Sequence, residues 1–510
     1  MDKNLITALP NLLKMKLQQY KDKVAFIDET RQITYEGLNQ STSSLAKGII
    51  DLGIKKHERV LTYMWNSINL VETYYGLPRA GAVCVFTNPA FTPRELNHML
   101  VDSKARAIIT DLDLYERSKI LYDDLPDLKY IIITGDKLPD NIHPGKKIMK
   151  YDELKAGGQL AEDLDVKITE PAWIQYTSGT TGTPKGAELS HGSLTYVTST
   201  MIEWFAINDK DIILGVLPLF HSYASNMCVL MAVGAGATTV IEKSFSPTKT
   251  PETIKKHGVT FFPAVPTMIT YILNSKPNKE MLSSLRIVTS AGAPLSKQLQ
   301  DQFEKTYGVE IYEGWGTTET CSWSTAIPLG KPIKTTESCG VAIPGIDVRV
   351  FDKNGKEVPR GQEGELVIKG PNVMTCYINR PEATAEALMY GYYWSGDIVK
   401  MDEKGYVYIK GRNKELIVSG GFNVYPKELE DVLVAKEGIL EAAVVGVQDP
   451  DKGEVPKAFC VLKDGCELCE EEILNHLKQN IARYKQPKYV QIVKELPKTP
   501  SGKVKKFMLK

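Results

Sequence analysis

The sequence has few cysteines, and their spacing excludes two classes of protein. Eight cysteines scattered over 510 residues do not form a disulfide framework, which excludes a secreted scaffold held together by disulfides. Cys466 and Cys469 form one Cys-x-x-Cys pair, but no second Cys/His pair lies nearby to complete a zinc site. We therefore expect free thiols and a cytoplasmic protein.

The sequence also lacks net charge. Its 62 basic and 62 acidic side chains cancel, which argues against a general nucleic-acid-binding protein. The stretch from Lys485 to Lys510 is a local exception, because its eight lysines face a single acid, Glu495. A local basic patch therefore stays possible at this end of the chain, although a solvated surface explains it nearly as well.

No hydrophobic run fits a signal peptide or a bilayer span. The first residues, Met1-Asp2-Lys3-Asn4, contain no apolar signal-peptide core. The uncharged stretch 222–241 is long enough to raise the question of a membrane span, but serines, threonines, glycines and Asn226 interrupt it. We expect a buried helix followed by a strand there, and no transmembrane segment.

Short apolar strands alternate with helices through the first three-fifths of the chain. The helical segment Ile68–Arg79 lies between the strand candidates Arg59–Tyr63 and Ala82–Phe86. Buried strands separated by helices predict an α/β architecture with parallel sheets. The other strand candidates are Ala107–Thr110, Tyr130–Thr134, Ala172–Tyr176, Ile212–Leu217, Thr238–Ile241, Thr260–Phe262 and Arg286–Thr289.

The pattern changes after about Gly340. Two hairpins are predicted, Val348–Phe351 with Gly364–Lys369, and Asp397–Met401 with Tyr406–Lys410. They indicate a small β-barrel-like subdomain attached to the α/β body.

A separate α/β unit follows Gly411, with a helix at Pro426–Val434, a strand at Glu441–Val447 and a helix at Glu470–Ala482. We predict an N-terminal domain over 1–411 and a small mobile α+β domain over 412–510. The boundary has no flexible-linker composition, so a sharp hinge fits it better than a tether.

The strongest chemical signal is a loop after the strand candidate Ala172–Tyr176. Three glycines let its backbone approach a ligand closely, while five hydroxyls and a lysine supply donors for phosphate oxygens. The Walker A pattern is absent, because Pro184 precedes the lysine. The alternative is a polar surface loop before a helix capped near Ser190. The loop is Thr177-Ser178-Gly179-Thr180-Thr181-Gly182-Thr183-Pro184-Lys185-Gly186.

This loop resembles the signature loop of the adenylate-forming enzymes (the ANL superfamily), which include acyl-coenzyme A synthetases, peptide-synthetase adenylation domains and firefly luciferase. The family's other motifs follow in order, and the chain is most similar to bacterial fatty-acid–CoA ligases. The family more often has tyrosine where Trp315 stands. The motifs are Leu217-Pro218-Leu219-Phe220-His221, Tyr312-Glu313-Gly314-Trp315-Gly316-Thr317-Thr318-Glu319, Gly364-Glu365-Leu366, Trp394-Ser395-Gly396-Asp397, Gly411-Arg412-Asn413-Lys414 and Leu496-Pro497-Lys498-Thr499-Pro500-Ser501-Gly502-Lys503.

The resemblance implies an AMP-forming acid–thiol ligase that uses ATP, Mg²⁺ and coenzyme A. It implies that Glu319 binds Mg²⁺, which takes few protein carboxylates. Taken alone, a glutamate is more often an ordinary surface acid. Catalytic roles are implied for Lys503, His221, Thr177 and Lys185. Nucleotide or coenzyme A contacts are implied for Thr177 to Gly182, Lys185, Gly292, Ala293, Pro294, Glu313, Gly314, Trp315, Gly316, Thr318, Asp397, Arg412, Lys414, Gly420, Gly421 and Lys503.

Several of these residues also have ordinary structural explanations. Asp397 follows a glycine turn and could simply form that turn, although its carboxylate suits two ribose hydroxyls. Trp315 could be a core residue rather than a stacking surface for adenine. Lys503 could be one solvated charge among eight; by resemblance it enters the site and stabilises the carboxylate and the α-phosphate.

The resemblance implies a rotation of the small domain about Lys414 after adenylation. This rotation would withdraw Lys503 and bring a face containing Gly420 and Gly421 to a passage for the thiol. One hinge residue can absorb such a backbone change.

The residues after the second motif bear on the substrate. His221 occupies the position where amino-acid-activating relatives have an aspartate, so a buried ammonium would lack a partner. Ala224 and Ala264 replace frequent glycines of fatty-acyl ligases, while Tyr223-Ala224 resembles plant coumarate ligases. We expect a medium- or long-chain fatty acid, ahead of an aryl or cinnamate-type acid. A carrier protein as acceptor, in place of free coenzyme A, and a monomer or a homodimer stay open.

Overall fold

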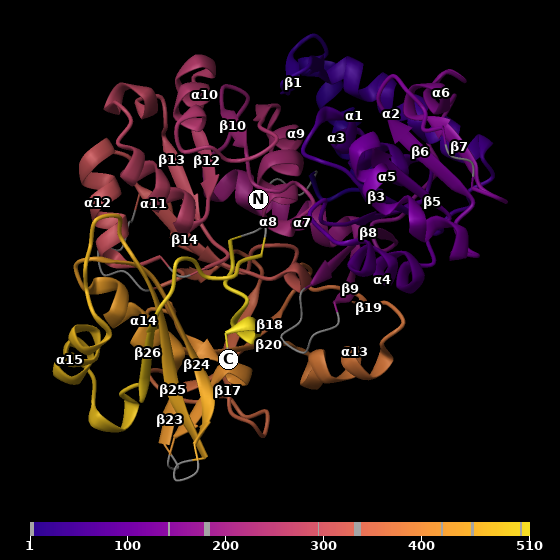
Figure 1. Ribbon diagram of the computed structural model, residues 1–510. Helices are drawn as coiled ribbons and strands as arrows, with labels where there is room; N and C mark the ends of the chain where they lie inside the picture. The colour runs from indigo at the N-terminus through magenta and orange to yellow at the C-terminus, as the bar shows by residue number, and fades with distance from the viewer. Residues whose placement is uncertain are drawn as a thin grey trace.

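Two sheets with parallel centres form the larger part of the molecule in the computed structural model (Figure 1). The structure describes residues 5–509 except 141–142, 178–183, 294, 331–337, 420–421, 450–452 and 500–501. One sheet has the order β19-β9-β8-β4-β3-β5-β6-β7 and is parallel from β8 to β7. Its strands are β3 (Arg59–Tyr63), β4 (Val83–Phe86), β5 (Ala107–Asp111), β6 (Tyr130–Thr134), β7 (Lys147–Lys150), β8 (Pro171–Thr177), β9 (Lys185–Ser190) and β19 (Cys376–Tyr377).

The second sheet has the order β16-β15-β14-β13-β12-β10-β11-β1-β2 and is parallel from β14 to β1. Its strands are β1 (Val24–Ile27), β2 (Gln32–Thr34), β10 (Ile212–Gly215), β11 (Thr238–Ile241), β12 (Phe261–Ala264), β13 (Ile287–Ser290), β14 (Ile311–Trp315), β15 (Thr325–Ala326) and β16 (Val341–Ala342).

A smaller antiparallel sheet with the order β17-β18-β20-β21 follows, and a separate α+β domain ends the chain. In that domain β26 runs parallel to β25, and the other strand pairs are antiparallel. The strands are β17 (Asp347–Phe351), β18 (Glu363–Lys369), β20 (Tyr393–Met401), β21 (Val407–Arg412), β22 (Ile417–Ser419), β23 (Phe422–Val424), β24 (Ile439–Asp449), β25 (Gly453–Leu462) and β26 (Tyr489–Ile492).

The helices cover the sheets and pack between them (Figure 1). The helices are α1 (Leu9–Tyr20), α2 (Tyr35–Asp51), α3 (Ile68–Arg79), α4 (Pro93–Ser103), α5 (Leu112–Ser118), α6 (Tyr151–Lys155), α7 (His191–Trp204), α8 (Ser222–Ala224), α9 (Met231–Ala235), α10 (Lys249–His257), α11 (Pro266–Ser275), α12 (Lys297–Tyr307), α13 (Pro381–Ala387), α14 (Pro426–Ala435) and α15 (Glu470–Asn480). Short turns include the π-helix η3 (Ser225–Leu230) and the 3₁₀ turns η5 (Thr318–Thr320) and η7 (Asn413–Glu415).

The helix α7 begins where the sequence predicts a cap. The Ser190 side chain accepts a hydrogen bond from the Ser193 backbone N–H and satisfies one orphan donor of the first turn. The helix is buried on most sides and contributes to the main hydrophobic core. The uncharged stretch 222–241 forms α8, η3, α9 and β11, all buried, as the sequence predicts.

The strands and helices named from the sequence are of the right type, but several strands are not among them, including β1, β2, β7, β9, β19, β25 and β26. Between the glycine-rich loop and the helix capped near Ser190 the sequence predicts no strand, whereas the structure has β9 there, paired antiparallel with β8. Lys185 and Gly186 therefore begin a strand. Glycine and lysine carry little strand preference, so this strand depends on its pairing with β8.

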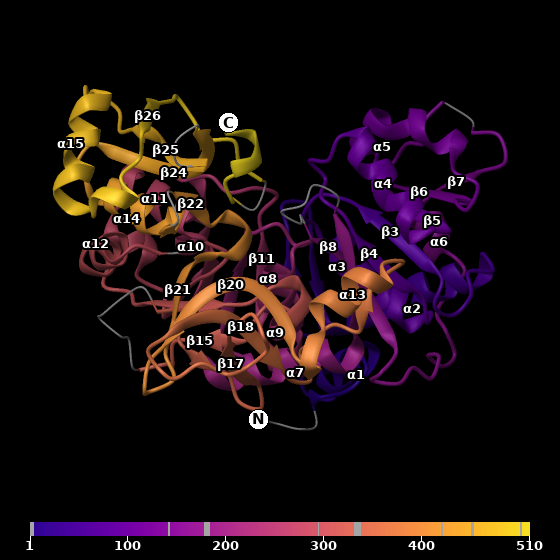
Figure 2. The same cartoon turned by 90° about the horizontal axis from the view of Figure 1, so that it is seen from below.

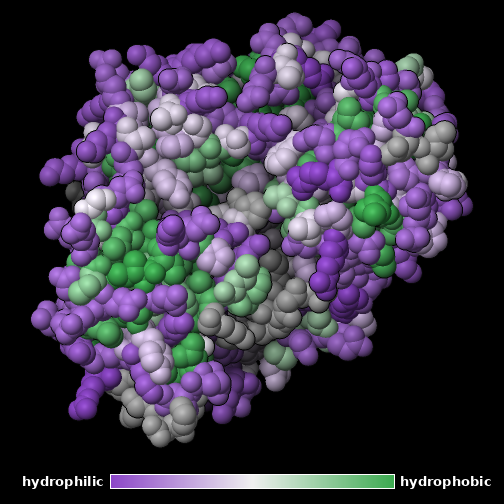
Figure 3. All heavy atoms as spheres, viewed as in Figure 1, coloured by the Kyte–Doolittle hydropathy of each residue, from purple (hydrophilic) through white to green (hydrophobic). Residues whose placement is uncertain are grey.

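The C-terminal domain, orange to yellow in Figure 2, lies over the half of the molecule that contains α11 and α12, and its last segment extends toward the middle of the molecule. The face shown in Figure 3 is mostly hydrophilic, with an apolar patch on the side of the C-terminal domain. Within the described residues, no helix is both long and apolar enough to cross a membrane.

Candidate functional site

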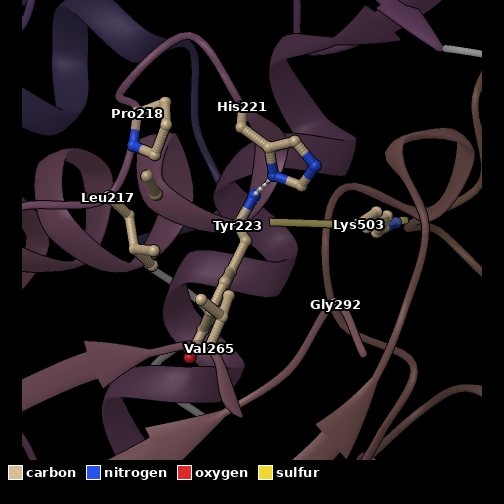
Figure 4. Close-up of a pocket in the computed structure, with 8 residues that line it drawn as sticks. Leu217, Pro218, His221, Tyr223, Val265, Gly292 and Lys503 are labelled. Carbon is tan, nitrogen blue, oxygen red and sulfur yellow. Dashed lines mark hydrogen bonds between the residues drawn. The ribbon is translucent and has the colours of Figure 1, made fainter. Parts of the chain in front are cut away.

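A small apolar cavity lies beyond the carboxyl ends of three parallel strands. His221 follows β10, Val265 follows β12 and Gly292 follows β13, so one edge of the sheet supplies one wall. Open α/β sheets place their ligands at this edge. The free space holds about one water molecule. The described residues that line it are Leu217, Pro218, His221, Tyr223, Ala224, Val265, Gly292 and Lys503 (Figure 4).

His221 caps the short helix α8, and this contact fixes its imidazole. Its Nδ1 accepts a hydrogen bond from the Tyr223 backbone N–H at 3.2 Å (Figure 4). An accepting Nδ1 leaves Nε2 as the nitrogen that carries the proton. Burial, together with the nearby Lys503 ammonium, lowers the pKa of His221 to about 3. The ring is therefore neutral near pH 7 and presents a neutral N–H donor.

Lys503 reaches the cavity from the C-terminal domain and lines it together with His221 (Figure 4). Its turn is held by a hydrogen bond from the Lys503 backbone N–H to Thr499 Oγ1 at 3.1 Å. Burial lowers the pKa of Lys503, as does the positive charge of Arg412, while the carboxylates of Asp397 and Glu319 raise it. Lys503 of the predicted C-terminal domain thus interacts electrostatically with Asp397 and Glu319 of the predicted N-terminal domain and with Arg412 at the predicted boundary.

Asp397 is buried, and both of its carboxylate oxygens have protein donors. Arg412 Nε lies 2.9 Å from Oδ1, and Trp315 Nε1 donates to Oδ2 at 2.8 Å. Asp397 and Arg412 are cross-strand partners in the β20–β21 pair. The Asp397 charge raises the pKa of Arg412. This arrangement holds a carboxylate in a fixed orientation beside a flat aromatic ring.

Glu319 is buried in η5 and is also held in a fixed position. Its Oε1 accepts a hydrogen bond from the Tyr377 hydroxyl at 2.6 Å. The Lys185 ammonium lies 4.4 Å from the centre of the Tyr377 ring. Within the described residues, no cluster of three or more His, Cys, Asp or Glu side chains could hold a metal. A single carboxylate held through one oxygen fits Mg²⁺, which takes few protein ligands and completes its coordination with phosphate oxygens and water.

Some motif residues have packing roles. A Cβ on Gly314 would lie 1.7 Å from the Trp323 ring, and one on Gly316 would lie 1.6 Å from the Ser322 carbonyl oxygen. Glu313 Oε1 accepts a hydrogen bond from the Leu295 backbone N–H at 3.3 Å. These contacts shape the strand β14 and the loop at 291–295, and through them the cavity.

The remaining predicted site residues are placed as follows. Thr177 Oγ1 donates to the Lys185 carbonyl oxygen at 3.4 Å, and Thr318 Oγ1 lies 3.5 Å from Ser222 Oγ. Gly292 has a φ of 83°, which favours glycine, and Ala293 follows it with intermediate exposure. The backbone of Lys414 lies in η7. Outside the described residues are Ser178, Gly179, Thr180, Thr181, Gly182, Pro294, Gly420 and Gly421.

Tyr377 is a site residue that sequence reasoning missed. It lies in the two-residue strand β19, paired with Ala187 of β9. It is 58 positions from Glu319 and belongs to none of the motifs given above. Only the pairing of β19 with β9 brings it to the site, and a two-residue strand has no detectable period in the sequence.

Tyr223 supplies an aromatic wall of the cavity. Its ring extends from α8 toward Val265 (Figure 4), and its hydroxyl hydrogen-bonds with Thr289 Oγ1 at 2.8 Å. The ring also packs edge-on against Trp323, with centroids 5.7 Å apart. Burial raises the pKa of the Tyr223 hydroxyl. This wall is rigid and apolar apart from one satisfied hydroxyl.

Known proteins similar to this chain match it over almost its whole length. A long-chain-fatty-acid–CoA ligase of Bacillus subtilis (strain 168) is 32% identical, with 97% of this chain and 93% of the relative covered. A feruloyl-CoA synthase of an Amycolatopsis species is 34% identical, with 93% and 92% covered. The crystal structure of the anthranilate CoA ligase AuaEII with anthranoyl-AMP has a TM-score of 0.92 at 25% identity, covering 98% of this chain and 96% of the other.

The family profiles agree with these relatives. The profile of the AMP-binding enzymes matches residues 13–378, and that of their C-terminal domain matches residues 428–503. The first match alone covers more than half of the chain. The chain therefore belongs to the AMP-binding enzyme family of adenylate-forming enzymes.

Proposed function

We propose that this protein is an ATP-dependent acyl-CoA ligase. It joins an apolar carboxylic acid to AMP, releases pyrophosphate, and then transfers the acyl group to coenzyme A and releases AMP. The observation that carries this proposal is the position of Lys503, which lines the cavity with His221 and lies in the field of Asp397 and Glu319. The relatives named above are acid–CoA ligases, and they cover nearly all of the chain.

Different side chains would bind the two negatively charged parts of the substrates, namely the carboxylate with the α-phosphate, and the outer phosphates. Lys503 and the neutral Nε2–H of His221 would bind the acid carboxylate and the α-phosphate, where negative charge concentrates. Lys185 and Thr177 would orient the outer phosphates, and Asp397 with Arg412 would hold the ribose. Glu319 would hold Mg²⁺, which neutralises phosphate charge when bound.

The cavity lining supports an apolar acid. Apart from Lys503 and His221, the described lining residues are uncharged, among them Leu217, Pro218 and Tyr223, and none of these described residues is acidic. An α-amino acid would bury its ammonium without a partner, at a cost of several kcal/mol. A medium- or long-chain fatty acid is our first candidate, as in the Bacillus relative.

An aryl acid is the second candidate, and a specific contact favours it. The Tyr223–Thr289 hydrogen bond closes the cavity with an aromatic wall, which suits a flat and short acid. A 4-coumarate-CoA ligase of Narcissus pseudonarcissus is 31% identical, close to the 32% of the Bacillus fatty-acid ligase. Sequence identity therefore does not separate the two candidates.

The test is AMP release from Mg²⁺-ATP with fatty, aryl and amino acids, each with and without coenzyme A. We expect AMP that depends on coenzyme A with a fatty acid, and the rates with aryl acids rank the second candidate. If pyrophosphate exchange occurs but coenzyme A does not stimulate AMP release, the acceptor is a carrier protein. No exchange with any acid would contradict the proposal.

We also propose the domain boundary at 411/412 and the hinge at Lys414. The strand β21 ends at Arg412, and η7 follows directly. The hydrophobic core of the body includes Val407, whereas the core of the C-terminal domain begins at Ile417. Among the described residues, no buried hydrophobic residue lies between Val407 and Ile417, which fits a pivot between two separate cores.

The Trp315 hydrogen bond to Asp397 leads to a prediction about ATP affinity. Trp315→Phe keeps a flat ring but removes the Nε1–H that donates to Asp397 Oδ2. A lost hydrogen bond to a charged acceptor is worth ~1.4 kcal/mol or more, so we expect the KM for ATP to rise about tenfold with little change in kcat. Pyrophosphate exchange at varied ATP measures both constants.

Trp204→Phe is the matched control for this variant. Trp204 Nε1 donates to the Ile327 carbonyl oxygen at 3.0 Å, in a place that does not line the cavity. It should leave the KM for ATP unchanged. An equal rise in both variants would show that the effect is a general loss of packing.

A further inference from the structure

Tyr377 touches two charged side chains that belong to different parts of the site. Its hydroxyl donates to Glu319 Oε1 at 2.6 Å, and its ring lies 4.4 Å below the Lys185 ammonium. The residue is buried, and its backbone is held in place by pairing with Ala187 and by a hydrogen bond from its N–H to Thr384 Oγ1 at 3.0 Å. One rigid side chain thus spans the distance between a carboxylate and an ammonium.

The hydroxyl decides the orientation of the carboxylate. A hydrogen bond to an ionised oxygen is short and about twice as strong as a neutral one. Within the described residues, no protein group donates to Glu319 Oε2, so one oxygen is held and the other is left for a ligand.

The ring has a separate effect on Lys185. An ammonium over an aromatic face is attracted by the ring quadrupole, and the attraction does not need the hydroxyl. Lys185 is the first residue of β9 and follows the loop that starts at Thr177. The contact with the ring therefore fixes where the Lys185 ammonium lies. The two functions of Tyr377 are therefore separable by substitution.

We propose that Tyr377 is a positioning residue that aligns Glu319 for Mg²⁺ through its hydroxyl and Lys185 for the phosphates through its ring. This inference rests on the proposed function, because it assigns ligands to both side chains. It predicts that Mg²⁺ and ATP strengthen each other's binding partly through Tyr377, although Tyr377 itself touches neither.

The test measures binding without turnover. Calorimetry with the α,β-methylene analogue of ATP, in Mg²⁺ and again in EDTA, gives the gain in affinity that the metal provides. In Tyr377→Phe, the factor by which Mg²⁺ increases the affinity for the analogue should fall about tenfold or more, as is common when the partner of a metal ligand is removed. Its affinity in EDTA should equal that of the wild type. Tyr377→Leu should lose the gain and also bind more weakly in EDTA, because Lys185 loses its ring.

Tyr392→Phe is a matched control. The Tyr392 hydroxyl donates to the Asp347 carboxylate at 2.7 Å, so the variant loses the same kind of bond at a residue that does not line the cavity. It should keep the full gain from Mg²⁺. If Tyr377→Phe also keeps it, the positioning role is wrong. If the wild-type protein binds no nucleotide, the proposed function fails, and this role fails with it.

Discussion

Replacing Lys503 with alanine is expected to lower the rate of acyl-adenylate formation by about 10²–10³-fold, the usual cost of losing one preorganised donor at a developing charge. Lys503 lines the cavity together with His221, and its Cε would lie 3.9 Å from a Cβ on Gly292. Among the described residues that line the cavity, no second cation could replace it. Pyrophosphate exchange with ATP and the best acid measures this step alone.

The second half-reaction provides the control for Lys503. Thioester formation from supplied acyl-adenylate and coenzyme A should be largely spared, because the proposed rotation withdraws Lys503 from the site. Lys505 lies in the same segment but is not among the residues that line the cavity. Lys505→Ala should therefore leave both steps unchanged. Equal loss of both steps in Lys503→Ala would contradict the assigned role.

The body of the fold could be predicted because its strands are buried on both faces. Two examples are the short, mostly apolar segments Arg59–Tyr63 and Tyr130–Thr134. The strands β3 and β6 begin and end at these same residues. The strand β9 could not be predicted, since Lys185–Ser190 lacks the β-branched and aromatic residues that mark strands. Its pairing with β8 and β19 compensates for its weak local preference.

The site could be predicted where its residues stand in ordered motifs, and the structure brings several of them together. His221 and Lys503 line one cavity although 282 positions separate them, and Asp397 faces Arg412 across a strand pair. The partners that orient these residues carry no such pattern. The Trp315–Asp397 and Tyr377–Glu319 hydrogen bonds join residues 82 and 58 positions apart. Contacts of this kind depend on tertiary packing, which periodicity does not encode.

Lys414→Pro is expected to separate the two half-reactions in the opposite direction. Proline fixes φ near −65°, within the range of the 3₁₀ turn that η7 adopts. The described arrangement has Lys503 at the cavity, which is the arrangement proposed for adenylation. The variant should therefore keep pyrophosphate exchange and lose about 10²-fold or more in thioester formation, because misplacing the thiol passage by a small distance has that effect.

Lys414→Ala distinguishes a backbone hinge from a side-chain contact. Alanine removes the side chain but leaves φ and ψ free, so a pure hinge predicts normal turnover in this variant and a block only in the proline variant. Rapid-quench measurement of acyl-adenylate adds a second criterion, since a chain fixed in the adenylation arrangement should accumulate the intermediate at one equivalent per site when coenzyme A is present. Normal overall turnover in Lys414→Pro would show that the domain does not rotate about Lys414. Equal losses in both variants would mean that the side chain, and not a backbone rotation, is what the second step requires.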